Sequence, residues 1–274
     1  MSRKKIKRRR KKKSRIDYKK VVLFILVCLV LIFGVAAILS KLISHKNEYF
    51  DEALAYYNEE EYDKALELFE KALDENQLFS QNKDKNTKLY IADIYIKTGQ
   101  YEKAVAEYDE VLEYTSVDKT DVEAMQDIAS ALYDFSEGNY AGALTVLEEN
   151  TDAFPELYMY VGTCYSALSD SENMFANYEK YIEAFGWNSY LYAQYAAYYI
   201  SIGELDNAYG YINNGLSSDD TFNAELRLQE IVYYEKIYNY DKAYELAEEL
   251  YELYPDFEKG VDEYTFLYTR VEHE

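Results

Sequence analysis

Two stretches that start 39 residues apart, 62–73 (YDKALELFEKAL) and 101–112 (YEKAVAEYDEVL), decide the fold of this chain. In each, a large residue stands three before an alanine and an apolar residue follows four later, so all three share one helix face. Weaker copies occupy 140–147, 205–216 and 240–251. Recurrence at intervals of 31 to 39 residues predicts stacked helix pairs. The central residues are Ala65, Ala104, Ala143, Met174, Ala208 and Ala243.

A period near 34 residues with two helices per unit resembles the tetratricopeptide repeat. In that family the first helix carries a small residue and, three later, a tyrosine; a turn glycine then precedes the second helix. Ala92, Tyr95 and Gly99 supply this pattern in the second copy, whereas Ser169 and Tyr238 replace the glycine in the fourth and sixth. The resemblance implies an all-α tetratricopeptide-type solenoid of about six repeats over residues 46–256, with a capping helix and tail in 257–274.

Two polar stretches separate the early copies, QLFSQNKDKNT at 77–87 and TSVDKTD at 115–121. They account for the two 39-residue intervals between the central alanines. Because neither shows apolar periodicity, we expect them to be loops between repeats one and two and between repeats two and three.

Ahead of the repeats, residues 21–39, from Val21 to Leu39, contain no charged side chain. A helix of that length spans about 28 Å, near the thickness of a bilayer's hydrocarbon core, which predicts a transmembrane signal-anchor helix over residues 21–43. Residues 1–20 carry thirteen Lys or Arg and one acid, which predicts a cytoplasmic tail and an array outside a bacterial plasma membrane, in the cell envelope. Cleavage as a signal peptide is the alternative, because Gly34, Ala36 and Ala37 are small.

Residues 21–274 hold 16 Lys or Arg against 50 Asp or Glu, a net charge of −34 that repels nucleic acid. We therefore expect no nucleic-acid partner, and we assign the basic tail to anionic lipid. Neither His45 nor His273 has neighbours at metal-ligand spacing, and no glycine-rich phosphate loop is present, so we expect no enzyme, no metal and no cofactor. Cys164 falls on an apolar helix face and is expected to be a core residue.

In tetratricopeptide repeats the concave groove is lined by the first helix of each pair, at its second, fifth, ninth, twelfth and thirteenth positions. That register predicts a largely apolar groove here, suited to an amphipathic helix or extended peptide of a partner protein. A carboxylate clamp is not expected, because Asn47, Asn58, Asn86 and Lys97 are scattered. The competing interpretation is that these side chains pack against neighbouring helices. The predicted groove residues are Phe50, Leu54, Tyr57, Leu89, Asp93, Lys97, Ile128, Leu132, Phe135, Met159 and Tyr190.

By analogy with other proteins of the tetratricopeptide-repeat fold, these features predict a membrane-anchored scaffold or adaptor for protein–protein interactions. A chaperone-like folding helper for secreted or envelope proteins is the alternative, and its groove would accept many apolar peptides. A eukaryotic organelle receptor would expose its repeats to the cytosol, which the basic tail opposes.

Overall fold

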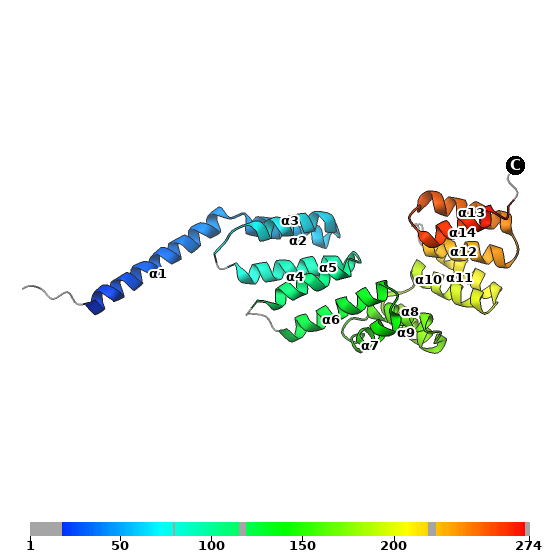
Figure 1. The fold of residues 1–274 in the computed structure, drawn as a ribbon, viewed down its shortest axis with the longest axis horizontal. Coiled ribbons are helices and arrows are strands. Elements are labelled where there is room, and N and C mark those ends of the chain that lie inside the picture. The colour runs from blue at the N-terminus through cyan, green and yellow to red at the C-terminus, as the bar shows by residue number, and fades with distance from the viewer. Residues whose placement is uncertain (1–17, 79, 115–118, 219–222, 272–274) are drawn as a thin grey trace, which may run out of the picture. The chain divides into compact units, whose positions relative to one another are not determined.

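The computed structural model describes residues 18–78, 80–114, 119–218 and 223–271, and every regular element among them is a helix (Figure 1). Residues 1–17 of the predicted basic tail (1–20) and His273 lie outside the described residues, and the last three residues of the tail begin α1. The chain forms two compact units, residues 1–146 and 147–274, with the boundary inside α7.

The N-terminal unit begins with an apolar helix, α1, and continues with helix pairs in which α2 packs on α3, α4 on α5, and α5 on α6. Its helices are α1 (Tyr18–Ile43), α2 (Lys46–Asn58), α3 (Tyr62–Asp74), α4 (Gln81–Lys97), α5 (Tyr101–Leu112), α6 (Lys119–Ser136) and most of α7 (Tyr140–Glu149).

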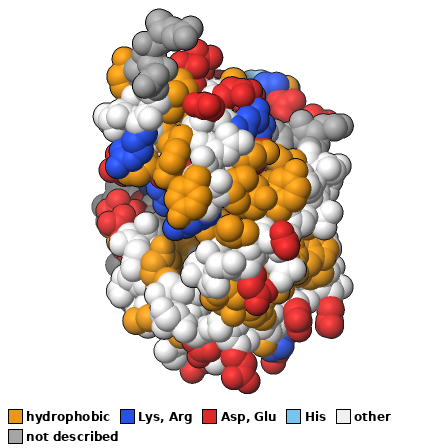
Figure 2. All heavy atoms as spheres, turned by 90° about the vertical axis from the view of Figure 1, so that its right-hand side faces the viewer, with side chains coloured by type: hydrophobic (Ala, Val, Ile, Leu, Met, Phe, Trp, Pro, Cys, Tyr) orange, Lys and Arg blue, Asp and Glu red, His pale blue; other side chains and the backbone are white. Residues whose placement is uncertain are grey.

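The C-terminal unit repeats the arrangement, with α8 packed on α9, α10 on α11, α12 on α13, and α14 on α13. Hydrophobic side chains gather in patches on the face drawn in Figure 2, with acidic side chains and a few Lys or Arg beside them. Its helices are α8 (Leu157–Ala167), α9 (Ser171–Phe185), α10 (Ser189–Ser201), α11 (Leu205–Ser218), α12 (Ala224–Lys236), α13 (Tyr240–Leu253) and α14 (Glu258–Tyr268).

The six central residues of the repeat lie where helices approach most closely. All five alanines have no exposed surface, and Met174 is 1% exposed. In the second repeat, Ala104 shares a core cluster with Ala92 of α4, Tyr108 of α5 and Ala129 of α6. The stack of helix pairs predicted from these positions is confirmed.

The fourth repeat keeps this packing although its central residue is a methionine. Its first helix carries Gly162 at the small position, where an added Cβ would lie 2.5 Å from the ring of Tyr178. The ring of Tyr178 on α9 therefore fills the space beside Gly162, and Tyr178 has no exposed surface.

In the turns between paired helices, six residues have a left-handed backbone conformation with positive φ. Each lies two positions before the second helix begins. Glycine occupies three of these positions, but Ser169 at φ 63° and Tyr238 at φ 61° adopt the same conformation. The turn geometry is therefore retained where glycine is missing, at a cost of roughly 1–2 kcal/mol for each residue that has a Cβ. The six residues are Glu60, Gly99, Gly138, Ser169, Gly203 and Tyr238.

The loop predicted at 77–87 is largely wrong, because α4 starts at Gln81. In the loop predicted at 115–121, residues 115–118 lie outside the described residues and α6 starts at Lys119. The 39-residue intervals come from first helices of 17 and 18 residues, which are longer than the 13 residues of α2. Polar tertiary contacts, rather than an apolar stripe, stabilise the first turns of α4.

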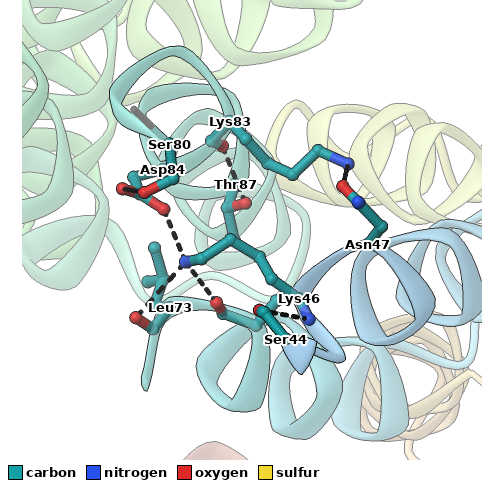
Figure 3. A network of polar contacts seen from close by, with 9 residues as sticks. Ser44, Lys46, Asn47, Leu73, Ser80, Lys83, Asp84 and Thr87 are labelled. Atoms are coloured by element: carbon teal, nitrogen blue, oxygen red, sulfur yellow. Dashed lines mark hydrogen bonds and ion pairs between the residues drawn. The ribbon is translucent and has the colours of Figure 1, made fainter. Parts of the chain in front are cut away.

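The polar contacts at the start of α4 centre on a buried lysine (Figure 3). Lys46 begins α2, and its side chain is only 2% exposed. Its Nζ donates to the carbonyl of Ala72 at 2.5 Å, in the last turn of α3, and to Oδ1 of Asp84 at 2.6 Å, in the first turn of α4. Ser80 donates to the other oxygen of Asp84 at 2.6 Å. One ammonium group therefore joins three helices, and the carbonyl end of α3 favours its positive charge.

α1 spans 26 residues and is, by length and composition, the helix among the described residues that is able to cross a membrane. Large apolar side chains between Val22 and Leu39 are 44 to 70% exposed. A signal sequence near the N-terminus has the same properties. An apolar N-terminal segment is thus confirmed.

We expect Ala104→Glu to destabilise the full-length protein in detergent by about 3–5 kcal/mol, because it buries an unpaired carboxylate where α5 meets α4. Ala106→Glu on the exposed face of the same helix is the matched control and should shift the unfolding midpoint little. Urea unfolding followed by circular dichroism measures both. Equal midpoints would contradict the close contact at Ala104.

Tyr238→Gly should stabilise the protein by about 0.5–1 kcal/mol, since glycine relieves the left-handed strain but loses more backbone entropy on folding. Tyr238 is 80% exposed, so little packing is lost. Tyr238→Ala removes the same ring and keeps the strain, and it should give no gain. A thermal shift as large for alanine as for glycine would show that the turn is unstrained.

Glu235 of α12 makes stability depend on pH. One of its carboxylate oxygens is buried without a hydrogen-bond partner among the described residues. Burial, and then the neighbouring carboxylate of Glu263 on α14, raise the pKa of Glu235 from 4.5 to about 8. The folded state therefore holds a proton that the unfolded state releases, so this group lowers the free energy of unfolding as pH rises from about 4.5 to 8.

Glu235→Gln should remove that decline, because the amide does not ionise. Glu179→Gln, at an exposed position of α9, is the matched control. Urea midpoints between pH 5 and 9 measure the difference, and parallel curves for wild type and Glu235→Gln would contradict the raised pKa.

Candidate functional site

A cavity of about 290 Å³ opens on two first helices of the N-terminal unit. Tyr57 comes from α2, and Asn86, Leu89, Tyr90 and Asp93 come from α4. The residues of α4 recur at three- and four-residue spacing, which places them on one side of that helix. Three predicted groove residues, Tyr57, Leu89 and Asp93, are thus brought to one cavity.

Stacked aromatic rings form the wall of this cavity. Tyr90 stacks on the fully buried Phe69, with ring centroids 5.4 Å apart and planes 8° apart. The rings of Tyr57 and Phe50 meet Tyr90 edge to face at 5.2 and 5.9 Å. Because Phe69 belongs to the core of α3, the wall is held in place before any ligand arrives.

Asp93 supplies the charged group among the residues that line the cavity. The hydroxyl of Tyr57 donates to Oδ2 of Asp93 at 2.5 Å. Burial, and then this bond, raise the pKa of Tyr57, so its hydroxyl stays protonated. The Asp93 side chain is 33% exposed, and a carboxylate accepts several hydrogen bonds. The exposed Lys97 lies 3.8 Å from the same oxygen.

Lysine flanks the other side of the aromatic wall. The ammonium group of Lys83 lies 4.7 Å from the centroid of the Phe50 ring and donates to Oδ1 of Asn47 at 2.5 Å. Lys83 is not among the predicted groove residues, because the polar start of α4 has no apolar periodicity and predicts a loop. Tyr90 is not among them either, because that position is not among the groove positions of the register. The spacing of residues 83, 86, 90, 93 and 97 is the signal that identifies this side of α4.

The other predicted groove residues of the N-terminal unit differ in exposure. Leu54 is half-buried on α2. Ile128 and Leu132 of α6 are buried, at 4% and 2% exposure, which leaves them little surface for a partner. Phe135 is half-buried, with its ring 5.4 Å from that of Tyr140 and edge to face.

Two predicted groove residues belong to the C-terminal unit, and both are half-buried there. Met159 packs against the core cluster of Met174 and Tyr178. The hydroxyls of Tyr190 and Thr163 are 2.7 Å apart, which ties Tyr190 to α8. These contacts fit the interpretation that both side chains pack against neighbouring helices.

Cys164 has no exposed surface, and burial raises the pKa of its thiol to about 11. The thiol therefore stays protonated, as a core residue would. His45 is exposed, and its Nδ1 lies 3.0 Å from Oε2 of Glu48, which raises the pKa of the imidazole. Within the described ranges, no three His, Cys, Asp or Glu side chains are grouped to hold a metal ion.

Residues 56–128 match the sequence model of the tetratricopeptide repeat family, and they include every residue that lines the cavity. No sequence among curated proteins matches this chain.

Several solved structures share the fold. The structure from a functional characterisation of pilF of Pseudomonas aeruginosa is 17% identical, covers 82% of this chain and 97% of its own, and has a TM-score of 0.53. PilW, a type IV pilus biogenesis factor, is 18% identical, covers 79% of this chain and 97% of its own, and has a TM-score of 0.52. A tetratricopeptide repeat protein of Parabacteroides merdae is 14% identical, covers 81% of this chain and 98% of its own, and has a TM-score of 0.53. Residues 56–128 are therefore tetratricopeptide-repeat sequence, and the helical array around them has the tetratricopeptide-repeat fold.

Proposed function

We propose that this protein is a membrane-anchored scaffold that binds a partner protein through the cavity on α2 and α4. The observation that most supports partner binding is the cavity itself, which has a fixed aromatic wall and one accessible carboxylate. Helical-repeat arrays bind other proteins through extended surfaces of this kind.

The chemistry of the cavity favours a peptide segment over a small charged metabolite. Tyr57, Leu89 and Tyr90 offer apolar surface for one side chain of the partner. Asp93 accepts hydrogen bonds, so it would pair with a backbone N–H or a donor side chain of the partner. This combination of apolar pocket and few placed polar groups is typical of peptide recognition.

The membrane part of the proposal rests on α1 and its flanks. The exposed apolar helix would anchor the protein, the basic tail would stay in the cytoplasm, and the acidic array would lie outside it. The backbone N–H of Leu78 donates to Oγ of Ser40 at 3.3 Å, which links the end of α1 to the segment before α4. In this arrangement the cavity would begin close to the bilayer.

Asp93→Asn should reduce the partner recovered after crosslinking in membranes by about tenfold, the value expected for losing one hydrogen bond to a charged group. The amide keeps an oxygen for Tyr57, so the melting temperature should change little. Asp109→Asn, which makes the same charge change on α5, is the matched control.

Quantitative mass spectrometry of the captured proteins reads out this experiment. Recovery of one stoichiometric partner, lost with Asp93→Asn and kept with Asp109→Asn, supports the scaffold. A large set of unrelated chains would instead favour a folding helper. Equal recovery with both variants would remove the cavity as the binding site.

Membrane orientation is tested by cysteine labelling in intact cells. Asn213→Cys on the exposed face of α11 should react with a membrane-impermeant maleimide, whereas Ser2→Cys should react only after lysis. The buried thiol of Cys164 should not react with the maleimide in intact cells or after lysis. A mature protein lacking residues 1–39 by mass would contradict the anchor, and labelling of Ser2→Cys alone would reverse the orientation.

A further inference from the structure

α14 has the sequence of a first helix rather than of a simple cap. Thr265 is followed three residues later by Tyr268, as Ala53 is followed by Tyr56 and Ala92 by Tyr95. The spacing places Thr265 34 residues after Ile231, the corresponding position of α12. The spacing in α14 is therefore that of a first helix.

In the preceding repeats a second helix covers this small position. Ala53 and Ala92 have no exposed surface, and neither has Ile231, the larger residue at this position of α12; each packs against the second helix of its pair. On α14 the same position, Thr265, is exposed, and Tyr268 is 49% exposed. Within the described residues, this face of α14 is not covered by a second helix.

The open face lies beside preformed aromatic packing. Tyr264 stacks on Tyr251 of α13, with ring centroids 4.8 Å apart and planes 6° apart. Tyr244 of α13 stacks on Tyr264 at 5.7 Å, and its centroid lies 6.3 Å from that of Tyr268. α14 is therefore held on α13 by its aromatic side, and a newly docked helix would meet a positioned surface.

The two C-terminal helices, α13 and α14, are acidic. Residues 240–271 carry nine Asp or Glu and three Lys or Arg, a net charge of −6. Acidic side chains also border the hydrophobic patches in Figure 2. A second copy of the chain would bring the same negative charge, whereas a basic helix is electrostatically complementary.

We propose that α14 docks a basic amphipathic helix of a partner protein, which packs at Thr265 and Tyr268 in the place of a second helix. The partner helix would pack on α14 as second helices pack on first helices in the hairpins α2–α3 and α4–α5, where an alanine of the first helix contacts the second helix. The partner's Lys and Arg side chains then face the carboxylates of α13 and α14.

A labelled peptide tests this proposal with full-length protein in detergent. The probe is the second-helix sequence 62–73 carrying Asp63→Lys, Glu67→Lys and Glu70→Lys, which makes it basic and keeps its small positions. Fluorescence anisotropy should show saturable binding. Adding Ala65→Glu to the peptide should weaken binding at least tenfold, because the contact residue is lost.

The decisive protein variant is Thr265→Glu, which is exposed and should not disturb folding. It adds negative charge, so simple attraction predicts tighter peptide binding, whereas the docked helix predicts at least tenfold weaker binding. Asn213→Glu makes the same charge change on α11 and should leave this affinity unchanged. Equal or tighter binding by Thr265→Glu overturns the proposal. Self-association of the chain that Thr265→Glu abolishes would also overturn it, since the occupant would then be a second copy.

Discussion

The close approach of two helices at a small side chain is the contact on which the rest of this structure depends. A central alanine with no exposed surface lets α5 lie directly against its neighbours, and the large residues around it then fill the remaining space. A single hairpin cannot bury its apolar face alone, so stacking is required. In the fourth repeat the buried Met174 stands where the other repeats have alanine, and the ring of Tyr178 packs against Gly162 of α8.

Polar contacts decide where the helices begin and end. A buried ammonium group such as that of Lys46 is tolerated only when it is paired and hydrogen-bonded. Here it meets a carboxylate of α4 and the carbonyl end of α3, so both requirements are met. This contact fixes the start of α4 against α2, and α4 supplies four of the five residues that line the cavity. The candidate site therefore depends on a polar network that lies outside it.

Apolar periodicity explains what could be predicted from the sequence. It located the central alanines, and family resemblance located the turn positions, including Ser169 and Tyr238, where the conformation persists without glycine. The start of α4 could not be predicted in this way. Its first two turns are polar and owe their stability to residues far away in the sequence, such as Lys46.

The same reasoning applies to the candidate site. The register of the first helices grouped Tyr57, Leu89 and Asp93 by helix geometry, and these three residues line one cavity. It gave no information on burial, which depends on the neighbouring helices. Ile128 is therefore almost fully buried although its register position matches that of Leu89. Tyr90 was missed because its place in the wall comes from stacking on Phe69 of another helix.

The account holds that the first helices, rather than the second helices, of the N-terminal unit contact the partner. Site-specific photo-crosslinking in living cells tests this most directly, with a photoreactive amino acid replacing Leu89 on α4 or the exposed Ala106 on α5. The account predicts a discrete crosslinked partner from position 89 and none from position 106. A partner captured from position 106 and not from position 89 would contradict it.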